Sequence, residues 1–149
     1  MKKIIFLLSV LCLIKVSAYS QILKPVTWSY AAKKTGPNTA TVFIKANIDQ
    51  GWHLYSQFVK EGGPVKTTFT FPPSLAYVLI GSTAEPKAVS KYESTFKMNV
   101  SYFERSAIFQ QKLKLKGKSA TVKGSIEFMV CNDKQCLPPE QIDFSILVN

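Results

Sequence analysis

The sequence is poor in the side chains that hydrolases and metal sites use. It contains a single histidine, His53, its nine acidic residues are scattered, and it has no Gly-x-Ser-x-Gly motif. A zinc site built from Cys131, Cys136 and His53 would lack an obvious fourth ligand, and it would suit an oxidising compartment poorly. We therefore expect neither a hydrolase nor a bound metal or cofactor.

Arginine is equally scarce, because Arg105 is the only one in the chain. The excess of positive charge comes from lysines spread along the sequence, whereas nucleic-acid-binding surfaces are clustered and usually rich in arginine. The densest basic run, residues 112–118, alternates lysine with leucine, which is typical of a strand with one face in solvent. The composition argues against a nucleic-acid partner and leaves attraction to acidic partners open.

Long hydrophobic runs are also missing, and the most apolar stretch lies within the first 20 residues. It follows two lysines and precedes small residues that include Ala18 and Ser20. A run of this length is too short to span a membrane comfortably. The pattern predicts a secretory signal peptide over residues 1–20, cleaved before Gln21 or, alternatively, after Ala18.

The chain expected after cleavage, residues 21–149, has no membrane span and is long enough for one domain with its own core. Removing the leader removes three lysines, which leaves 16 basic and nine acidic residues, a net charge of +7. Cys12 would be lost with the leader. A lipid anchor on Cys12 is disfavoured, because Leu11 precedes it where a small residue is expected.

The mature chain has no convincing helical period, internal repeat or low-complexity tract. Alternating apolar residues and turn-forming Gly, Pro and Asn predict short strands instead. The predicted strands are residues 26–30, 40–48, 52–58, 66–71, 75–80, 98–104, 107–115, 120–131 and 142–148, with residues 81–96 irregular. Eight or nine short strands in one domain favour an all-β, two-sheet sandwich over a barrel.

Cys131 and Cys136 are the two cysteines that remain after the leader, and they flank the polar residues 132–135. An alternating, β-branched and aromatic run precedes them, so the local pattern predicts a strand, a tight turn and a second strand. Directly opposed positions in such a hairpin hold their Cβ atoms about 4.5 to 5.5 Å apart, and a disulfide needs about 3.5 to 4.5 Å. A modest local adjustment would therefore allow a bridge.

Such a bridge is either a structural staple or a working redox pair. On the chain-entropy model, closing a six-residue loop is worth only about 2 kcal/mol, against nearly 5 kcal/mol for a loop of about a hundred residues. Pro138 and Pro139 remove two donors, so the second strand cannot pair normally before Glu140, which leaves Cys136 at an under-paired edge. A local structural disulfide is nevertheless common in exported β-domains, and spacing alone leaves both interpretations open.

Four segments together resemble the N-terminal periplasmic domain of the thiol:disulfide interchange protein DsbD. They are GWHLYSQ at 51–57, GP followed by TFTF within 63–71, VSYFE at 100–104, and IEFMVCNDKQCLPPE at 126–140. The last is the most specific, because a short-spaced cysteine pair is followed by Pro-Pro-Glu. The resemblance covers nearly the whole mature chain.

The resemblance implies an immunoglobulin-like β-sandwich with a C-terminal hairpin that carries the cysteine pair. Such domains take electrons from a thioredoxin-like donor by reversible disulfide exchange. They pass them to periplasmic thiol-disulfide proteins, such as disulfide isomerases and cytochrome c maturation thioredoxins. By this resemblance, Cys136 would form the mixed disulfide with a partner and Cys131 would resolve it.

The resemblance also implies residues that flank the pair. The irregular segment before VSYFE would be a cap loop, whose aromatic residue covers the disulfide until a partner displaces it. Phe96 is the best candidate, Tyr92 is the alternative, and an ordinary core role for Phe96 stays open.

His53 and Tyr55 match positions beside the disulfide in this family. Alternation puts both on one strand face, opposite Trp52 and Leu54. If that face meets the hairpin, the imidazole would assist proton transfer and the phenol would hydrogen-bond a thiolate. A partly buried, merely hydrogen-bonded histidine is the alternative.

The sequence shows neither a multi-span membrane domain nor a thioredoxin-like domain. We therefore expect a separate protein to supply electrons, or the module to act as a binding domain. Two functions stay open: a redox relay of the cell envelope, and a non-catalytic, immunoglobulin-like protein-binding domain whose disulfide is structural. A reduction potential well below about −300 mV would favour the structural bridge.

Overall fold

Eleven β-strands make up the computed structural model, which describes residues 23–149. The predicted leader lies outside the described residues. The strands are β1 (Val26–Gly36), β2 (Thr39–Ile48), β3 (His53–Tyr55), β4 (Thr68–Thr70), β5 (Tyr77–Ala84), β6 (Val89–Glu93), β7 (Met98–Phe103), β8 (Ser106–Leu115), β9 (Ala120–Phe128), β10 (Val130–Cys131) and β11 (Glu140–Val148). Between residues 23 and 149 the model has no helix of the length and apolarity needed to cross a membrane.

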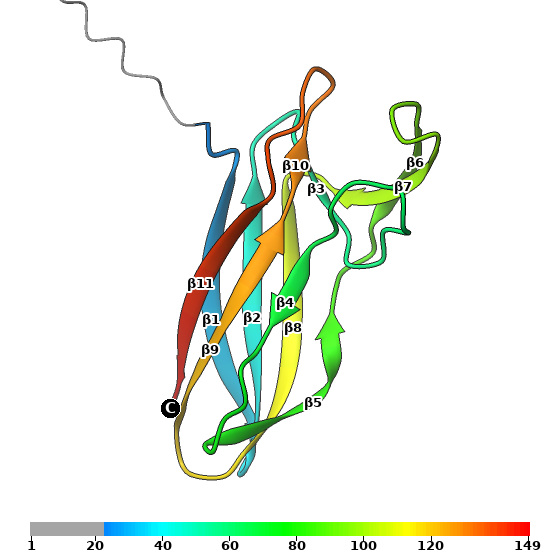
Figure 1. Ribbon diagram of the computed structural model, residues 1–149. Helices are drawn as coiled ribbons and strands as arrows, with labels where there is room; N and C mark the ends of the chain where they lie inside the picture. The colour runs from blue at the N-terminus through cyan, green and yellow to red at the C-terminus, as the bar shows by residue number, and fades with distance from the viewer. Residues whose placement is uncertain (1–22) are drawn as a thin grey trace, which may run out of the picture.

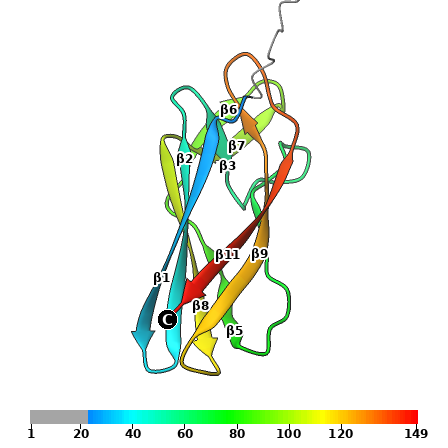
Figure 2. The same ribbon diagram turned by 90° about the vertical axis from the view of Figure 1, so that its left-hand side faces the viewer.

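The strands form the two-sheet sandwich that the sequence pattern predicts, with the immunoglobulin-like fold that the resemblance implies, and a third sheet of shorter strands lies at one end (Figure 1). One large sheet has the order β1-β2-β8-β5 and the sheet facing it has the order β11-β9-β4. The third sheet, β10-β3-β7-β6, is named the end sheet here. The view in Figure 2 shows β11 and β9 crossing the strands of the other large sheet at an angle, which the twist of packed sheets produces.

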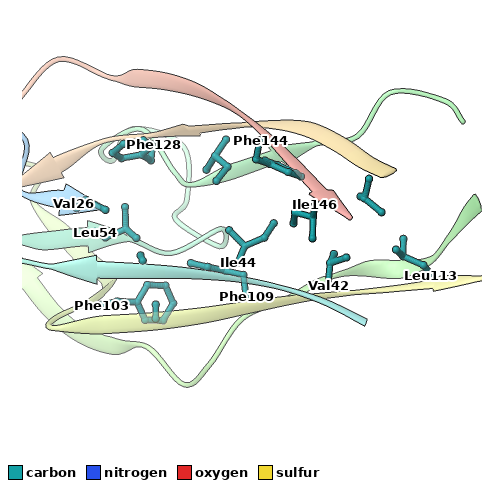
Figure 3. Packing of buried hydrophobic residues seen from close by; sticks show 14 of the residues in the cluster. Val26, Val42, Ile44, Leu54, Phe103, Phe109, Leu113, Phe128, Phe144 and Ile146 are labelled. Carbon is teal, nitrogen blue, oxygen red and sulfur yellow. The ribbon is translucent and has the colours of Figure 1, made fainter. Parts of the chain in front are cut away.

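The core lies between the two large sheets. β8 alternates strictly, so that Leu113 and Leu115 are buried while Lys112 and Lys114 are exposed, which confirms the predicted strand with one wet face. Figure 3 shows side chains of the first sheet meeting those of the second, among them Val42, Ile44, Phe109 and Leu113 on one side and Phe128, Phe144 and Ile146 on the other. Neither cysteine of the pair belongs to this main cluster.

Residues 81–96 were predicted to be irregular, and this prediction is wrong. β5 continues to Ala84 through a bulge after Ile80, and β6 forms an antiparallel hairpin with β7. β6 is exposed on nearly all its residues, so it has no apolar alternation to signal a strand. The bulge depends on Gln111, whose Nε2 donates to the Ile80 and Gly81 carbonyls at 3.2 and 3.3 Å.

Three of the other predicted strands differ from the structure in length or continuity. The strand predicted over 52–58 keeps only His53–Tyr55, because the Glu85 carboxylate accepts hydrogen bonds from the Ser56 hydroxyl and, at 2.9 Å, from the Gln57 backbone. The strand predicted over 120–131 is split at Met129 into β9 and β10. The first strand, predicted to end at residue 30, runs on to Gly36, because it pairs along nearly its whole length with β2.

Candidate redox site

A disulfide joins Cys131 and Cys136 at the tip of a hairpin, with 4.0 Å between their Cα atoms. The two residues are direct antiparallel partners. Backbone hydrogen bonds of 2.9 Å close the hairpin on either side of the bridge, from Asn132 N to Gln135 O and from Leu137 N to Val130 O. The strand and tight turn predicted from the sequence are therefore present, and Cys136 lies opposite Cys131 as the predicted bridge requires.

The turn is stiffened by one side chain and two prolines. The Oδ1 atom of Asn132 accepts from the backbone N–H groups of Lys134 and Gln135 at 2.9 and 2.8 Å, an Asx turn. Regular pairing resumes only at Glu140, after Pro138 and Pro139. The hairpin consequently stands beyond the large sheets, at the end of the sandwich opposite the C-terminus (Figure 1).

The two cysteines differ in exposure. Cys131 is only 4% exposed, whereas Cys136 is an exposed residue on the returning arm of the hairpin. Cys131 packs in a second, smaller cluster with Tyr55, Val100 and Tyr102, on the end sheet. An incoming thiol can therefore approach Cys136 from solvent while Cys131 stays covered.

The end sheet brings the predicted flanking residues to the pair. Cys131 lies directly opposite His53 in the β10–β3 ladder, and Tyr55 lies opposite Tyr102 in the β3–β7 ladder. Cross-strand partners share a face, so these four side chains belong to one surface of the sheet. On the other face, Leu54 of β3 and Trp52, which directly precedes the strand, lie in the main core, the arrangement that alternation predicts.

Two residues at this site were missed by sequence reasoning. The ring of Tyr102 lies 4.4 Å from that of His53, centroid to centroid, and Glu104 Oε1 is 3.1 Å from His53 Nε2. Alternation within VSYFE does place Tyr102 and Glu104 on the same face. What the sequence does not contain is the pairing of β7 with β3, which turns that face toward Cys131.

Both tyrosines of this face hold their protons tightly. Burial, followed by the nearby Glu93 and Tyr102, raises the pKa of Tyr55 to about 12. Burial, followed chiefly by Glu104, also raises the pKa of Tyr102. At neutral pH the two phenols are therefore neutral O–H groups, able to donate to a sulfur anion and unable to act as bases.

This pKa shift predicts an alkaline loss of stability that depends on Tyr55. Between pH 10.0, its ordinary pKa, and about 12, the unfolded chain releases the Tyr55 proton while the folded chain keeps it. The contribution of Tyr55 to the free energy of unfolding is thus complete below pH 10.0, and it is lost as the pH rises toward about 12. Since the site is partly solvated, we expect a loss of about 1 kcal/mol.

Urea unfolding of wild type and Tyr55→Phe at neutral and strongly alkaline pH measures this effect. The variant is expected to lose less stability on alkalinisation than wild type. Tyr92→Phe, at a tyrosine that is 60% exposed, is the matched control and should behave as wild type. Equal alkaline losses in wild type and Tyr55→Phe would contradict the assignment.

The two candidate cap residues lie in different environments. Phe96 sits in the turn that joins β6 to β7, where its backbone N–H donates to Glu93 O at 3.2 Å, and it packs partly buried against the second cluster. Tyr92 is in β6 itself, opposite Asn99, and points largely into solvent. The segment is a β-hairpin, and Cys136 is exposed in this structure.

Residues 23–149 contain no group of three or more His, Cys, Asp or Glu side chains arranged to hold a metal ion. One cleft of about 320 Å³ is lined by Gln57, Phe69 and Gln111, and another of about 390 Å³ by Lys123, Asp143 and Phe144; neither includes Cys131 or Cys136. The disulfide is a surface site.

The fold and the site define an immunoglobulin-like sandwich domain with a stiff, half-exposed disulfide hairpin at one end. Comparison with protein families matches residues 20–147 to the family described as "Thiol:disulfide interchange protein DsbD, N-terminal". The chain belongs to this family. A search of curated proteins finds no match.

Solved structures share the fold at low sequence identity. The N-terminal periplasmic domain of ScsB from Proteus mirabilis aligns with a TM-score of 0.60 and 15% identity over 85% of this chain and 47% of that chain, so this chain spans about half its length. The reduced DsbD N-terminal domain of Neisseria meningitidis aligns with a TM-score of 0.55 and 16% identity, over 86% and 91% of the two chains. A complex between the DsbD N-terminal and PilB N-terminal domains of Neisseria meningitidis gives 0.55 and 15%, over 84% and 87%.

Proposed function

We propose that this chain is a thiol-disulfide exchange module of the cell envelope, working through Cys131 and Cys136. The observation that carries the proposal is the exposure of Cys136, bonded to a buried Cys131 on a hairpin that lies outside the main core. A structural disulfide stabilises a fold most when it closes a long loop through the core. This bridge closes a short loop and lies outside the core. Family membership supports the same activity.

In the reductive half of the proposed reaction, a partner thiolate attacks Cys136 Sγ. The Cys131–Cys136 bond breaks, and Cys131 leaves with the electron pair and takes up a proton. The second thiol of the partner then attacks the partner's sulfur atom in the mixed disulfide. The bond from that sulfur to Cys136 breaks, and Cys136 is released as a thiolate. The partner becomes oxidised and this chain holds a dithiol.

In the oxidative half, the Cys136 thiolate attacks a disulfide of a second partner and Cys131 resolves the mixed disulfide. The order of the two roles follows from access, because only Cys136 is exposed to another protein. Phe96, at the β6–β7 turn, is proposed as the cap that a partner displaces, and Tyr55 as a donor to the Cys131 thiolate.

The proposed donor is a thioredoxin-like protein, and the acceptors are periplasmic thiol-disulfide proteins. The complex of the related DsbD domain with a PilB domain supports contact with another protein domain. The similar ScsB domain is described as periplasmic, and the predicted signal peptide over residues 1–20, followed by one domain over 21–149, agrees with export to that compartment.

Mixing the oxidised chain with reduced thioredoxin tests the proposal. Free thiols are alkylated after a short reaction and counted by mass spectrometry of the intact protein. We expect Cys131 and Cys136 both to become alkylated, with thioredoxin oxidised in equal amount. A pair that stays oxidised under these conditions would instead support the binding domain with a structural disulfide.

A further inference from the structure

The His53 side chain lies on the same face of the end sheet as Cys131 and is enclosed by its neighbours. The two residues are directly opposed in the β10–β3 ladder, on the same face of the end sheet, where side-chain Cβ atoms lie about 4.5 to 5.5 Å apart. His53 is only 14% exposed through its side chain, and the ring of Tyr102 packs against it. Both neighbours restrict the imidazole to few orientations.

Glu104 decides which ring nitrogen is free. Its Oε1 atom bonds His53 Nε2 at 3.1 Å, and within residues 23–149 this is the one hydrogen bond of the imidazole. With Nε2–H donated to the carboxylate, Nδ1 is the nitrogen available to a second partner. Glu104 directly follows β7, and the next residue is anchored, because Arg105 adopts a φ of 62° and Arg105 O accepts from Ile48 N at 2.7 Å.

We propose that Glu104 is a positioning residue that holds His53 through Nε2, so that Nδ1 accepts the proton of the Cys131 thiol when Cys131 closes the disulfide. The inference rests on the proposed exchange function and deepens it. The buried position of Cys131 is what makes a base useful there, because burial in apolar surroundings disfavours the thiolate that must attack.

The other groups around this face fit the role less well. The phenols of Tyr55 and Tyr102 keep their protons at neutral pH. The charged groups that act on Tyr102 are Glu104, which directly follows β7, Lys91 and Glu93 of β6, and Asp133 of the hairpin turn. Of these, only Glu104 makes a hydrogen bond to His53 within residues 23–149.

The step is balanced within the chain and its disulfide partner. The Cys131 thiol gives its proton to His53, and the thiolate attacks Cys136 Sγ in the mixed disulfide. The Cys131–Cys136 bond forms as the bond from Cys136 to the partner sulfur breaks, and the partner leaves as a thiolate with the electron pair. One disulfide is consumed and one is made.

Oxidised glutathione separates the two steps of the reaction. The reduced chain is mixed with it, quenched with acid at intervals, and the glutathionylated and oxidised forms are resolved by mass spectrometry over a range of pH. The first step, attack by Cys136, does not use His53. The second step, release of glutathione by Cys131, is expected to slow about a hundredfold in His53→Gln, which should also lose the imidazole's inflection from the pH profile.

Variants of Glu104 test the positioning role. We expect Glu104→Ala to slow the second step about tenfold with an unchanged first step, and Glu104→Gln, whose amide oxygen still accepts from Nε2, to keep most of the rate. Glu127→Ala removes an exposed carboxylate from β9 and serves as the matched control. If the second step keeps its wild-type rate in both Glu104→Ala and His53→Gln, this inference is overturned and the proposed function is not. If wild type lacks either step, the proposed function itself is overturned.

Discussion

Cys136→Ser is expected to abolish exchange completely, whereas Cys131→Ser is expected to convert the protein into a trap. In Cys131→Ser the exposed Cys136 thiol remains, so it attacks a partner disulfide and the product cannot be resolved within the chain. In Cys136→Ser the remaining thiol, Cys131, is buried and out of a partner's reach. The two variants carry the same chemical change and act as controls for each other.

The measurement is a non-reducing gel or mass spectrum after incubation with an oxidised thioredoxin-type protein. Cys131→Ser should accumulate a covalent complex that dithiothreitol dissolves, and Cys136→Ser should form none. If Cys136→Ser traps the partner and Cys131→Ser does not, the assigned roles are reversed. If both variants unfold, the pair is a staple and the relay loses its main support.

Phe109→Ala is expected to have the largest effect on stability, lowering the free energy of unfolding by about 3 to 5 kcal/mol. Phe109 is fully buried on β8 and its ring contacts those of Trp28, Phe69 and Phe103, with centroid separations from 4.8 to 6.2 Å. Truncation leaves a cavity between the two large sheets that these neighbours cannot fill. Reducing the disulfide closes no such gap and should cost about 2 kcal/mol.

Urea unfolding of the oxidised wild type, the reduced wild type and Phe109→Ala compares these effects directly. Ile108→Ala is the matched control, because Ile108 neighbours Phe109 on β8 and is 42% exposed. We expect a change within about 0.5 kcal/mol for the control. A larger loss on reduction than in Phe109→Ala would show that the sandwich depends on the bridge more than on its core.

The sandwich was predictable where strands bury one face. In β8 every second residue is buried, so the sequence carries a clear period of two, and the same holds for the end of β11. β6 was missed because it buries almost nothing, and the end of β5 was missed because its bulge depends on Gln111, a residue about 30 positions away. Contacts of that range leave no local pattern.

The hairpin of the site was predictable from local sequence, and His53 and Tyr55 from the family resemblance, but Tyr102 and Glu104 were not. The spacing of Cys131 and Cys136, the polar turn and the two prolines are all local, and they specified the bridge. The contribution of Tyr102 and Glu104 arises only when β7 pairs beside β3, which in turn lies beside β10. The difference in exposure between the two cysteines likewise arises from the end sheet, which covers one of them.

The reduction potential of the Cys131–Cys136 pair tests the central claim most directly. It is measured by equilibrating the protein in glutathione buffers of graded composition and counting free thiols. A pair that opens and closes for other proteins is expected to have a potential more oxidising than about −300 mV. A potential well below that value, with the bond resistant to the buffer, would mean that the disulfide is structural and would contradict this account.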